Sequence, residues 1–389
     1  MTGGGRGARW LTRDDLGAAA GSATGLLLVS PDVSSVFPLS PADRAAAAEL
    51  TGAALREAGV GARDRVVVAL AEPAGALWTA AAADVAGAAA CVGPRGRMRL
   101  HHALTALKAT TLVATPTGAM DFLSRLHLEF LLDPLDLGLR SIVLTGEIAA
   151  RRTLGHLAGE FGARVTEVLA SPFGGGALAW RAAEDEPLRP LAEGLLGLAA
   201  LGKDELAKDD LGKNDLGKDE PATNGRAGGG QAEGGGQVEG GGPAELVITP
   251  AGHATLGDAV LRTGLVAAAA GPGLPAPAHT VGEHVLVRGV WLALPRIDRA
   301  LSRIDGVAGW ELTVNRQGTL DTAVLTVTFG RQSLVGNPMW KARIEQAVRA
   351  LTPVSVRVET AREISETPAP GTVNDLRGHH LGRDRALVV

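Results

Sequence analysis

Residues 110–115 have the sequence Thr-Thr-Leu-Val-Ala-Thr, and a helix-like segment at 117–127 separates them from the next apolar run, Ser-Ile-Val-Leu at 141–144. Both runs are apolar without alternation, which is typical of strands that are buried on both faces. The same unit of apolar run and helix recurs at 65–108 and at 148–169. Such repeats predict a parallel sheet covered by helices, with ligands beyond the carboxyl ends of its strands.

One helix start is well marked. Ser40 supplies an N-cap, Pro41 the first helical position and Asp43 the acidic residue three positions after the cap. The expected strands before residue 200 are 25–29, 65–70, 88–92, 110–115, 141–144 and 164–169, and the expected helices are 40–59, 71–87, 98–108, 117–127 and 148–161. The loops after Val29, Leu70, Val92, Thr115, Leu144 and Leu169 are therefore the expected functional loops.

The second half of the chain has a different pattern. Residues 244–290 are rich in strand-forming residues, with strands expected at 245–249 and 284–290. The last hundred residues predict helices at 295–304 and 338–350 and strands at 310–315, 320–329 and 354–360. We therefore expect an α/β fold: a large N-terminal part with parallel sheets flanked by helices plus a β-rich subdomain, and a small α+β C-terminal domain.

Two repeats divide these halves. Residues 201–220 are four copies of a Leu-Gly-Lys-Asp-Glu-like unit, and a Gly-Gly-Gly-Gln repeat follows up to Gly242. A period of five fits neither a helix nor a strand, and a glycine tract cannot offset its ordering entropy. We expect domains at 1–200, 243–285 (the β-rich end of the N-terminal domain) and 286–389 (mobile), with a disordered insert at 201–242.

Composition excludes several classes of partner. Apolar residues make up 46% and the formal net charge is −4, so no basic face for nucleic acid is expected. Met1–Asp15 lacks the apolar core of a signal peptide, and no apolar stretch reaches 18 residues. Cys91 is the single cysteine, and its apolar run predicts a buried small hydrophobe. A cytoplasmic location without membrane contact is expected.

Several short motifs resemble one enzyme family. Residues 287–297 are similar to the "I-I-R-G-V-N-V-F-P-x-Q-I" motif of phenylacetate–CoA ligases, a branch of the AMP-forming, adenylate-forming ligases. Further similarities are 354–358 to "V-S-V-R-V", 382–386 to "G-K-A-x-R", 114–117 to "V-T-P-S", 144–147 to "F-G-A-E" and 245–249 to "G-E-L-V-F-T". The resemblance is colinear over about two-thirds of the chain, and residues 1–200 are short for the family.

The resemblance implies a reaction and its site. Acid and ATP·Mg²⁺ would give an acyl-adenylate, and CoA would then displace AMP after the C-terminal domain turns. An aryl or acyl acid and CoA are thus the implied partners. The matching site residues are Thr115, Gly146, Glu147 and Arg262 for the nucleotide, Gly282 and Glu283 for the hinge, and Arg383 in place of the catalytic lysine. The candidates for the phosphate loop are Ser22, Thr24 and Gly25, and a second candidate loop lies at 29–35.

Four departures weaken this expectation. The family's "Y-G-L-S-E" corresponds to residues 169–173, where Leu169 replaces the adenine-stacking aromatic residue and Phe173 the Mg²⁺ carboxylate. Leu265 replaces the ribose-binding aspartate, and Arg383 lacks the compact ammonium group of lysine. Adenylation is therefore expected to be impaired or lost, and no metal ligands are assigned.

Three hypotheses remain open from the sequence. The first is a diverged acid–CoA ligase, and the second is a non-catalytic relative that binds an acid, CoA or a protein partner. The third is an accessory protein that handles a CoA thioester or an acyl carrier.

Overall fold

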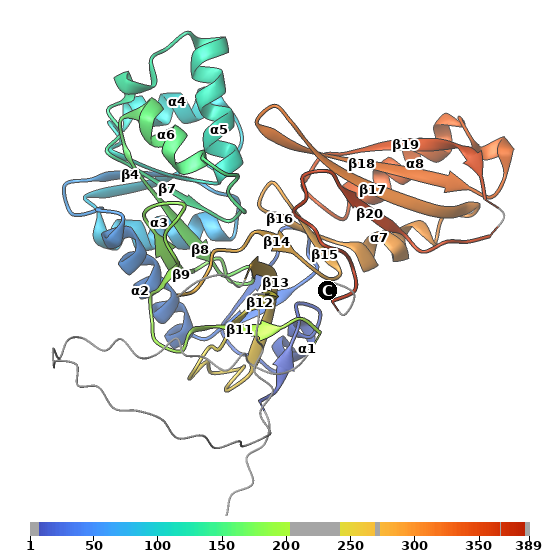
Figure 1. Cartoon of the computed structure of the whole chain (residues 1–389), viewed down its shortest axis with the longest axis horizontal. Helices are drawn as coiled ribbons and strands as arrows, with labels where there is room; N and C mark the ends of the chain where they lie inside the picture. Colours follow the sequence, from blue (N-terminus) through green and yellow to red (C-terminus); the bar gives the residue numbers. More distant parts are fainter. Residues whose placement is uncertain (1–7, 203–241, 269–272, 366, 386–389) are drawn as a thin grey trace, which may run out of the picture.

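The computed structural model describes residues 8–202, 242–268, 273–365 and 367–385. Figure 1 shows three parts: a large α/β part, a β-rich part below it and a C-terminal part beside both. None of the helices among these residues is long and apolar enough to cross a bilayer.

The large part is built on a seven-stranded sheet with the order β10-β9-β8-β7-β6-β4-β5. Its strands are β4 (Arg65–Ala69), β5 (Ala88–Cys91), β6 (Thr111–Ala114), β7 (Ser141–Thr145), β8 (Arg164–Ala170), β9 (Ala177–Arg181) and β10 (Arg189–Pro190). The five strands from β4 to β8 are parallel, whereas β9 and β10 are antiparallel. The predicted parallel sheet is thus confirmed.

Helices cover both faces of this sheet, as Figure 1 shows. They are α2 (Pro41–Glu57), α3 (Ala74–Val85), α4 (Arg97–Ala106), α5 (Pro116–Arg125) and α6 (Thr153–Phe161), with a π-helical turn at Leu126–Phe130 and a 3-10 turn at Pro134–Leu137. Val67 packs with α4, α5 and α6, whereas its neighbours Val66 and Val68 pack with α2 and α3. Successive strand residues point to opposite faces, so an unbroken apolar run buries both. The expected capping box forms between Ser40 and Asp43.

The β-rich part is a five-stranded sheet made from distant segments. It contains β1 (Trp10–Leu11), β11 (Leu196–Ala200), β12 (Pro243–Ile248), β13 (Val260–Ala268) and β14 (His279–Thr280), and α1 (Leu16–Ala20) lies nearby. β11 and β12 pair antiparallel up to Ala200 and Ala244. The predicted insert at 201–242 therefore connects two adjacent strands, and 203–241 lies outside the described residues.

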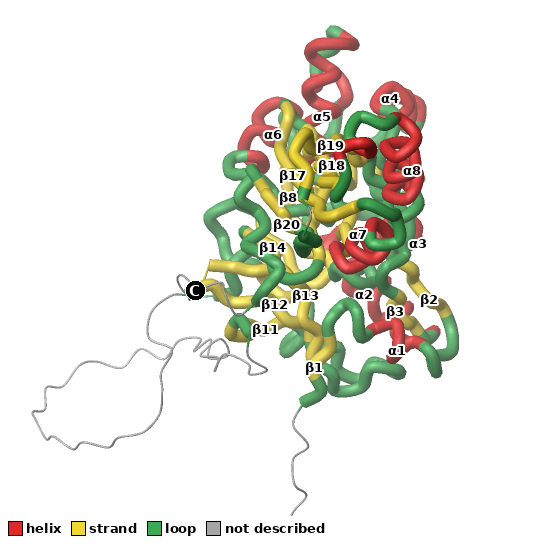
Figure 2. Tube along the Cα trace, turned by 90° about the vertical axis from the view of Figure 1, so that its right-hand side faces the viewer, coloured by secondary structure: helices red, strands yellow, loops and turns green. Residues whose placement is uncertain are grey.

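The C-terminal part has its own core. Its elements are β15 (His284–Val287), β16 (Val290–Ala293), α7 (Leu294–Leu301), β17 (Val307–Gln317), β18 (Leu320–Phe329), a 3-10 turn at Gln332–Leu334, α8 (Pro338–Arg349), β19 (Val356–Ile364) and β20 (Thr372–Asp375). The sheet order is β19-β18-β17-β20, and α7 and α8 pack on one face over alternating strand residues such as Leu312, Val314 and Leu325. Figure 2, viewed from this side, shows α7 and the strands in front of the N-terminal helices.

Four local expectations were wrong in whole or in part. The strand expected at 25–29 is confirmed as β2 (Leu26–Val29), but it is not a parallel strand of the large sheet: it pairs antiparallel with β3 (Val36–Leu39), because its short connection cannot make a parallel crossover. The strand expected at 284–290 is a hairpin, since Arg288 and Gly289 both adopt positive φ. The helix expected from 148 begins at Thr153, after Arg152 with φ 67°. Cys91 is exposed, because β5 is the edge strand.

Candidate functional site

A cavity of about 930 Å³ lies beyond the carboxyl ends of the parallel strands. Each of the six loops expected to be functional contributes to its wall. Their lining residues are Ser30 and Pro31 after β2, Leu70 to Ala74 after β4, Pro94 to Leu100 after β5, Thr115, Thr117 and Gly118 after β6, Gly146 to Ile148 after β7, and Ser171 to Phe173 after β8. The opposite wall comes from Leu265 and Leu286 and from the C-terminal residues Arg288 to Trp291, Leu320 and Pro353 to Ser355. This position agrees with the rule for open α/β sheets.

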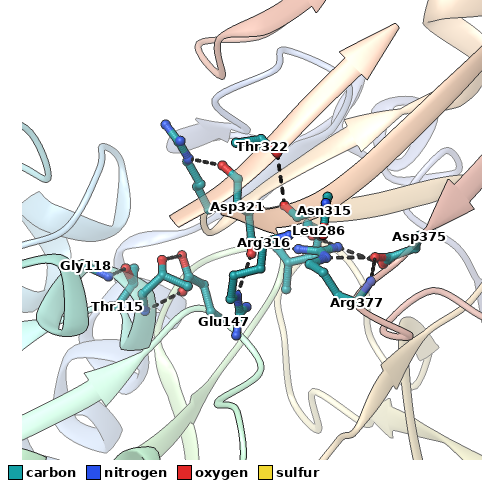
Figure 3. Close-up of polar contacts among 12 residues, drawn as sticks. Thr115, Gly118, Glu147, Leu286, Asn315, Arg316, Asp321, Thr322, Asp375 and Arg377 are labelled. Atoms are coloured by element: carbon teal, nitrogen blue, oxygen red, sulfur yellow. Dashed lines mark hydrogen bonds and ion pairs between the residues drawn. The ribbon is translucent and has the colours of Figure 1, made fainter. Parts of the chain in front are cut away.

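Three of the predicted site residues meet in this cavity: Thr115, Gly146 and Glu147. Thr115 caps α5 by accepting a hydrogen bond from the amide of Gly118. Glu147 accepts two hydrogen bonds from Thr117, one from the amide and one from the hydroxyl, both at 2.9 Å. Figure 3 shows Glu147 turned toward the start of α5. Both carboxylate oxygens of Glu147 are therefore used by the protein itself.

The tip of the β15–β16 hairpin closes the cavity over these residues. A Cβ atom placed on Gly289 would lie 3.5 Å from the carbonyl oxygen of Gly146 and 3.5 Å from Cγ2 of Thr115. These distances are ordinary van der Waals contacts, so the φ of 73° is what favours glycine at this position. The motif at 287–291 is thus brought beside the motif at 144–147, although about 140 residues separate them in the sequence.

The environment of Glu147 favours its neutral form. Burial raises the pKa of Glu147, and the nearby Asp321 carboxylate raises it further, whereas the hydrogen bonds from Thr117 lower it. Asp321 itself is shared by Arg316 and Arg377, and Arg377 also binds Asp375 and the carbonyl of Leu286, as Figure 3 shows. This buried network fixes the C-terminal sheet against β15 at the back of the cavity.

The phosphate-loop candidates lie elsewhere. Ser22, Thr24 and Gly25 are outside the cavity lining, and Gly25 is needed because a Cβ there would lie 2.6 Å from the carbonyl oxygen of Leu39. Of the second candidate loop, Ser30 and Pro31 reach the cavity. The Ser30 hydroxyl donates to Asp32 at 2.6 Å and accepts from the amides of Ser34 and Ser35. That hydroxyl is thus already engaged within its own loop.

Arg262 also lies outside the cavity lining. Its guanidinium is 2.7 Å from the buried Glu245 carboxylate and stacks on Trp10 at 4.8 Å. Glu245 also accepts from the amide of Gly264 at 2.8 Å. The structure therefore places Arg262 in the β12–β13 pair, where it balances a buried charge.

The three apolar replacements do face the cavity. Leu169, Phe173 and Leu265 all line it. Phe173 stacks with Phe37 at 6.0 Å between ring centroids, and Leu265 packs in a cluster with Leu286 and Trp291. The resemblance expects an aromatic ring and two carboxylates at these three positions. The cavity wall has two leucine side chains and a phenyl ring there instead.

The predicted hinge residues and the terminal segment form a second cluster, outside the cavity lining. Gly282 has φ 92°, and Glu283 follows it. Arg383 binds Glu283 at 2.6 Å, Asp298 at 2.8 Å and the carbonyl of Gly371 at 2.9 Å. Arg383 is therefore held inside the C-terminal part, away from Thr115 and Glu147.

The terminal segment is also paired with the hinge backbone. The amide of Thr280 donates to the carbonyl of His379, and the amide of Gly282 donates to that of Gly382. Burial is the main reason that the pKa values of His379 and His380 fall to about 4 and that of His284 to about 3. These histidines are thus neutral at the hinge near pH 7.

Sequence reasoning missed arginines of the lining in two places. The segment from Gly93 to Arg99, which runs into the first turn of α4, brings Arg95, Arg97 and Arg99 to the cavity, and their closeness to Pro94 and Gly96 was a visible signal. Arg13, in the loop before α1, also lines the cavity, and no sequence motif indicated it. Only the tertiary fold brings it beside Phe173 and Trp291.

Four of the five acidic residues of the lining are engaged by arginine or threonine side chains within the protein, and one of these, Glu129, pairs with Arg125. Mg²⁺ needs carboxylate oxygens that are free to bind it. Glu147 is occupied by Thr117, Asp121 pairs with Arg97 and Arg125, and Glu167 pairs with Arg181. In the part of the chain that the structure describes, no three histidine, cysteine, aspartate or glutamate side chains gather as metal ligands.

No family model matches this sequence, and no curated protein is significantly similar to it. Solved structures are similar. The chain matches 2-hydroxyisobutyryl-CoA ligase with 2-HIB-AMP and CoA in the thioesterification state at a TM-score of 0.69 and 15% identity, covering 95% of this chain and 80% of that one. The same ligase in the postadenylation state gives 0.53 at 16% identity, with 95% and 81% covered. An amide bond synthetase from Marinactinospora thermotolerans gives 0.60 at 15% identity, with 89% and 66% covered.

This structure holds its C-terminal part through contacts such as that between Arg95 and the carbonyl of Pro353, and between Thr319 and Asp121. At these low identities the comparison establishes the fold and no activity. The chain has the fold of the adenylate-forming acyl-CoA ligases.

Proposed function

We propose that this protein binds an acyl or aryl acid together with CoA, or their thioester, on a ligase fold whose adenylation step is impaired. The observation that carries the proposal is that Leu169, Phe173 and Leu265 face one cavity. A nucleotide there would leave its ribose hydroxyls and its metal ion without the acceptors that they require. Each unmet polar group costs about 1–3 kcal/mol, which is about one to two decades of affinity.

The arginine-rich edge of the cavity supports CoA as a ligand. Arg95 and Arg99 donate to backbone carbonyls, and among the described residues no carboxylate lies within ion-pair distance of either. Their charges are therefore available to phosphate groups, which arginine binds well. CoA carries phosphates at one end and a thiol at the other, and the apolar walls suit the acyl group. The 2-hydroxyisobutyryl-CoA ligase structure, to which this fold is similar, is a complex that contains CoA.

A second candidate is a non-catalytic relative that binds the same ligands. The position of Arg383 favours it. Arg383 stands where the resemblance places the catalytic lysine, yet two carboxylates and a carbonyl hold it outside the cavity lining. These partners engage the donors with which Arg383 would otherwise meet a bound acid.

Calorimetric titrations of the full chain with CoA and with Mg·ATP test the main proposal. CoA should bind at least tenfold more tightly than Mg·ATP, for which we expect a millimolar dissociation constant or weaker. Arg95→Gln with Arg99→Gln should weaken CoA about tenfold or more. Arg343→Gln, which removes a cation stacked on Trp340 outside the cavity lining, is the matched control.

Acid-dependent exchange of pyrophosphate into ATP separates the two candidates. Exchange with a panel of aryl and acyl acids should be weak if the ligase is diverged and at background if the protein is non-catalytic. Robust exchange by the unmodified protein would contradict both. Phe173→Glu with Leu265→Asp should raise affinity for Mg·ATP, because it returns two acceptors to the cavity wall.

A further inference from the structure

Arg13 is a buried cation in the wall of the cavity. Its side chain lies between two aromatic rings: the guanidinium carbon is 5.1 Å from the ring centroid of Phe173 and 4.8 Å from that of Trp291. Only 4% of the residue is exposed, although it lines the cavity. The two ring faces stabilise the positive charge where water cannot.

The polar contacts of Arg13 are few. One Nη donates to the hydroxyl of Ser35 at 3.3 Å, and the other donates to the carbonyl of Pro172 at 2.8 Å. Among the described residues, no carboxylate lies within ion-pair distance of this guanidinium. A guanidinium has five N–H donors, so donors remain for a ligand. A buried cation without a hydrogen-bonded counter-ion is costly, and an anion that enters the cavity removes that cost.

Two carboxylates act on Arg13 through space. Asp32 and Asp14 favour its charged form, whereas burial lowers its pKa to about 10. Oδ1 of Asp32 accepts hydrogen bonds from the Ser30 hydroxyl and the Ser34 amide. Oδ2 of Asp32 has no hydrogen-bond partner among the described residues. Arg13 therefore stays protonated at neutral pH without being neutralised by a direct ion pair.

The surroundings of Arg13 select the kind of anion. Trp291 belongs to an apolar cluster with Leu188, Leu265 and Leu286, and all four line the cavity. A polyphosphate beside these side chains would lose its hydration without enough cations to replace it. A single carboxylate on an apolar body matches one cation within apolar walls.

We propose that Arg13 binds the carboxylate of the acid directly, so that the cavity takes its acid without a divalent metal. The inference rests on the proposed function in treating the cavity as the acid site, and it adds the residue and the metal independence. Phe173, which replaces the expected metal ligand, is the ring on which Arg13 stacks. A fixed charge of the chain thus lies beside the position where the ligase plan uses a carboxylate and a metal ion.

The test compares acids with their amides on the full chain. Phenylacetate and octanoate should each bind at least tenfold more tightly than phenylacetamide and octanamide, with the same dissociation constants in EDTA and in Mg²⁺. Arg13→Gln should abolish this preference for the acid, and Arg13→Lys should keep part of it. Arg189→Gln is the control, because Arg189 stacks on Trp180 outside the cavity lining.

Equal binding of acid and amide to the unmodified protein would overturn the role of Arg13 while leaving the cavity as an acid site. A preference that survives in folded Arg13→Gln, or that needs Mg²⁺, would overturn it as well. If no acid of the panel binds at all, the proposed function is contradicted, and the inference about Arg13, which rests on it, is contradicted as well. The comparison on the unmodified protein decides the matter even if Arg13→Gln does not fold.

Discussion

Arg383 and Glu283 are 100 residues apart in the sequence, and their side chains meet at 2.6 Å. Asp298 lies 2.8 Å from the same guanidinium, so one cation joins the hinge, α7 and the terminal segment. Burial lowers the pKa of Arg383, but the hydrogen bonds to Glu283 and Asp298 outweigh it, and the pKa is raised overall. This cation therefore ties the terminal segment to α7 and to Glu283 within the C-terminal part.

Arg383→Ala should loosen this arrangement with little cost in stability. The pair is partly exposed, so we expect the free energy of unfolding to fall by at most about 1 kcal/mol. Limited proteolysis near 282–283 should become faster than in the parent. Arg357→Ala, which removes a more exposed ion pair with Glu359, is the control. Unchanged cleavage would show that Arg383 does not restrain the hinge.

Acid should destabilise the folded chain through its buried histidines. An unfolded histidine takes up a proton near pH 6.5, whereas His284, His379 and His380 do so only near pH 3 to 4. Between these values the unfolded state binds more protons. The stabilisation is therefore complete above pH 6.5 and is lost as the pH falls toward 4, by at most about 1.4 kcal/mol per pH unit for His284.

Urea titrations at several pH values measure this slope. His284→Gln should flatten it, and His102→Gln, on an exposed position of α4, is the control. Glu147 and Glu167 have raised pKa values, so each contributes with the opposite sign and reduces the total slope. A slope that is the same in His284→Gln and in the parent would contradict the assignment to this residue.

Gly371→Ala should destabilise the C-terminal part. A Cβ atom at Gly371 would lie 1.9 Å from the indole ring of Trp310, which is buried and donates to Asp298. Overpacking of this kind costs about 1–3 kcal/mol. Gly159→Ala in α6 is the control, since nothing lies within 4 Å of its added Cβ and alanine favours a helix. Thermal midpoints of the two variants should move in opposite directions.

Removal of residues 203–241 should leave the fold intact. Ala200 and Ala244 are paired in the antiparallel ladder of β11 and β12, so the four residues that remain between them, Leu201, Gly202, Gly242 and Pro243, can join the two strands as a short loop. We expect a thermal midpoint within a few degrees of the parent and unchanged titrations with CoA. Loss of folding would show that this segment has a structural role.

Expression of residues 284–389 alone, which contain all of β15 and the predicted unit 286–389, tests the predicted C-terminal domain. Its apolar cluster contains only residues between Val285 and Val358, so the unit buries its own core. Well-dispersed amide signals in an NMR spectrum are expected. A collapsed spectrum would mean that β15 and β16 need the cavity wall of the N-terminal part.

Local pattern was sufficient for most secondary structure. The parallel strands from β4 to β8 follow from apolar runs separated by helical segments, and the capping box at Ser40 and Asp43 fixed the start of α2. Patterns failed where the backbone turns within an apolar run. The turn at Arg288 and Gly289 divides a stretch that has the composition of one strand.

The sequence by itself determined the α/β plan and the loops that surround the cavity, because both depend on periodicity and strand order. The sequence also identified Leu169, Phe173 and Leu265 as departures from the nucleotide-binding motifs of the ligase family. Only the tertiary structure decided which polar groups are free for a ligand. Arg262 and Arg383 are bound by carboxylates, whereas Arg13 lies between two rings and forms no direct ion pair with any residue that the structure describes. These partners come from residues about 17 to 280 positions away, and no local pattern encodes contacts that form when distant segments pack together.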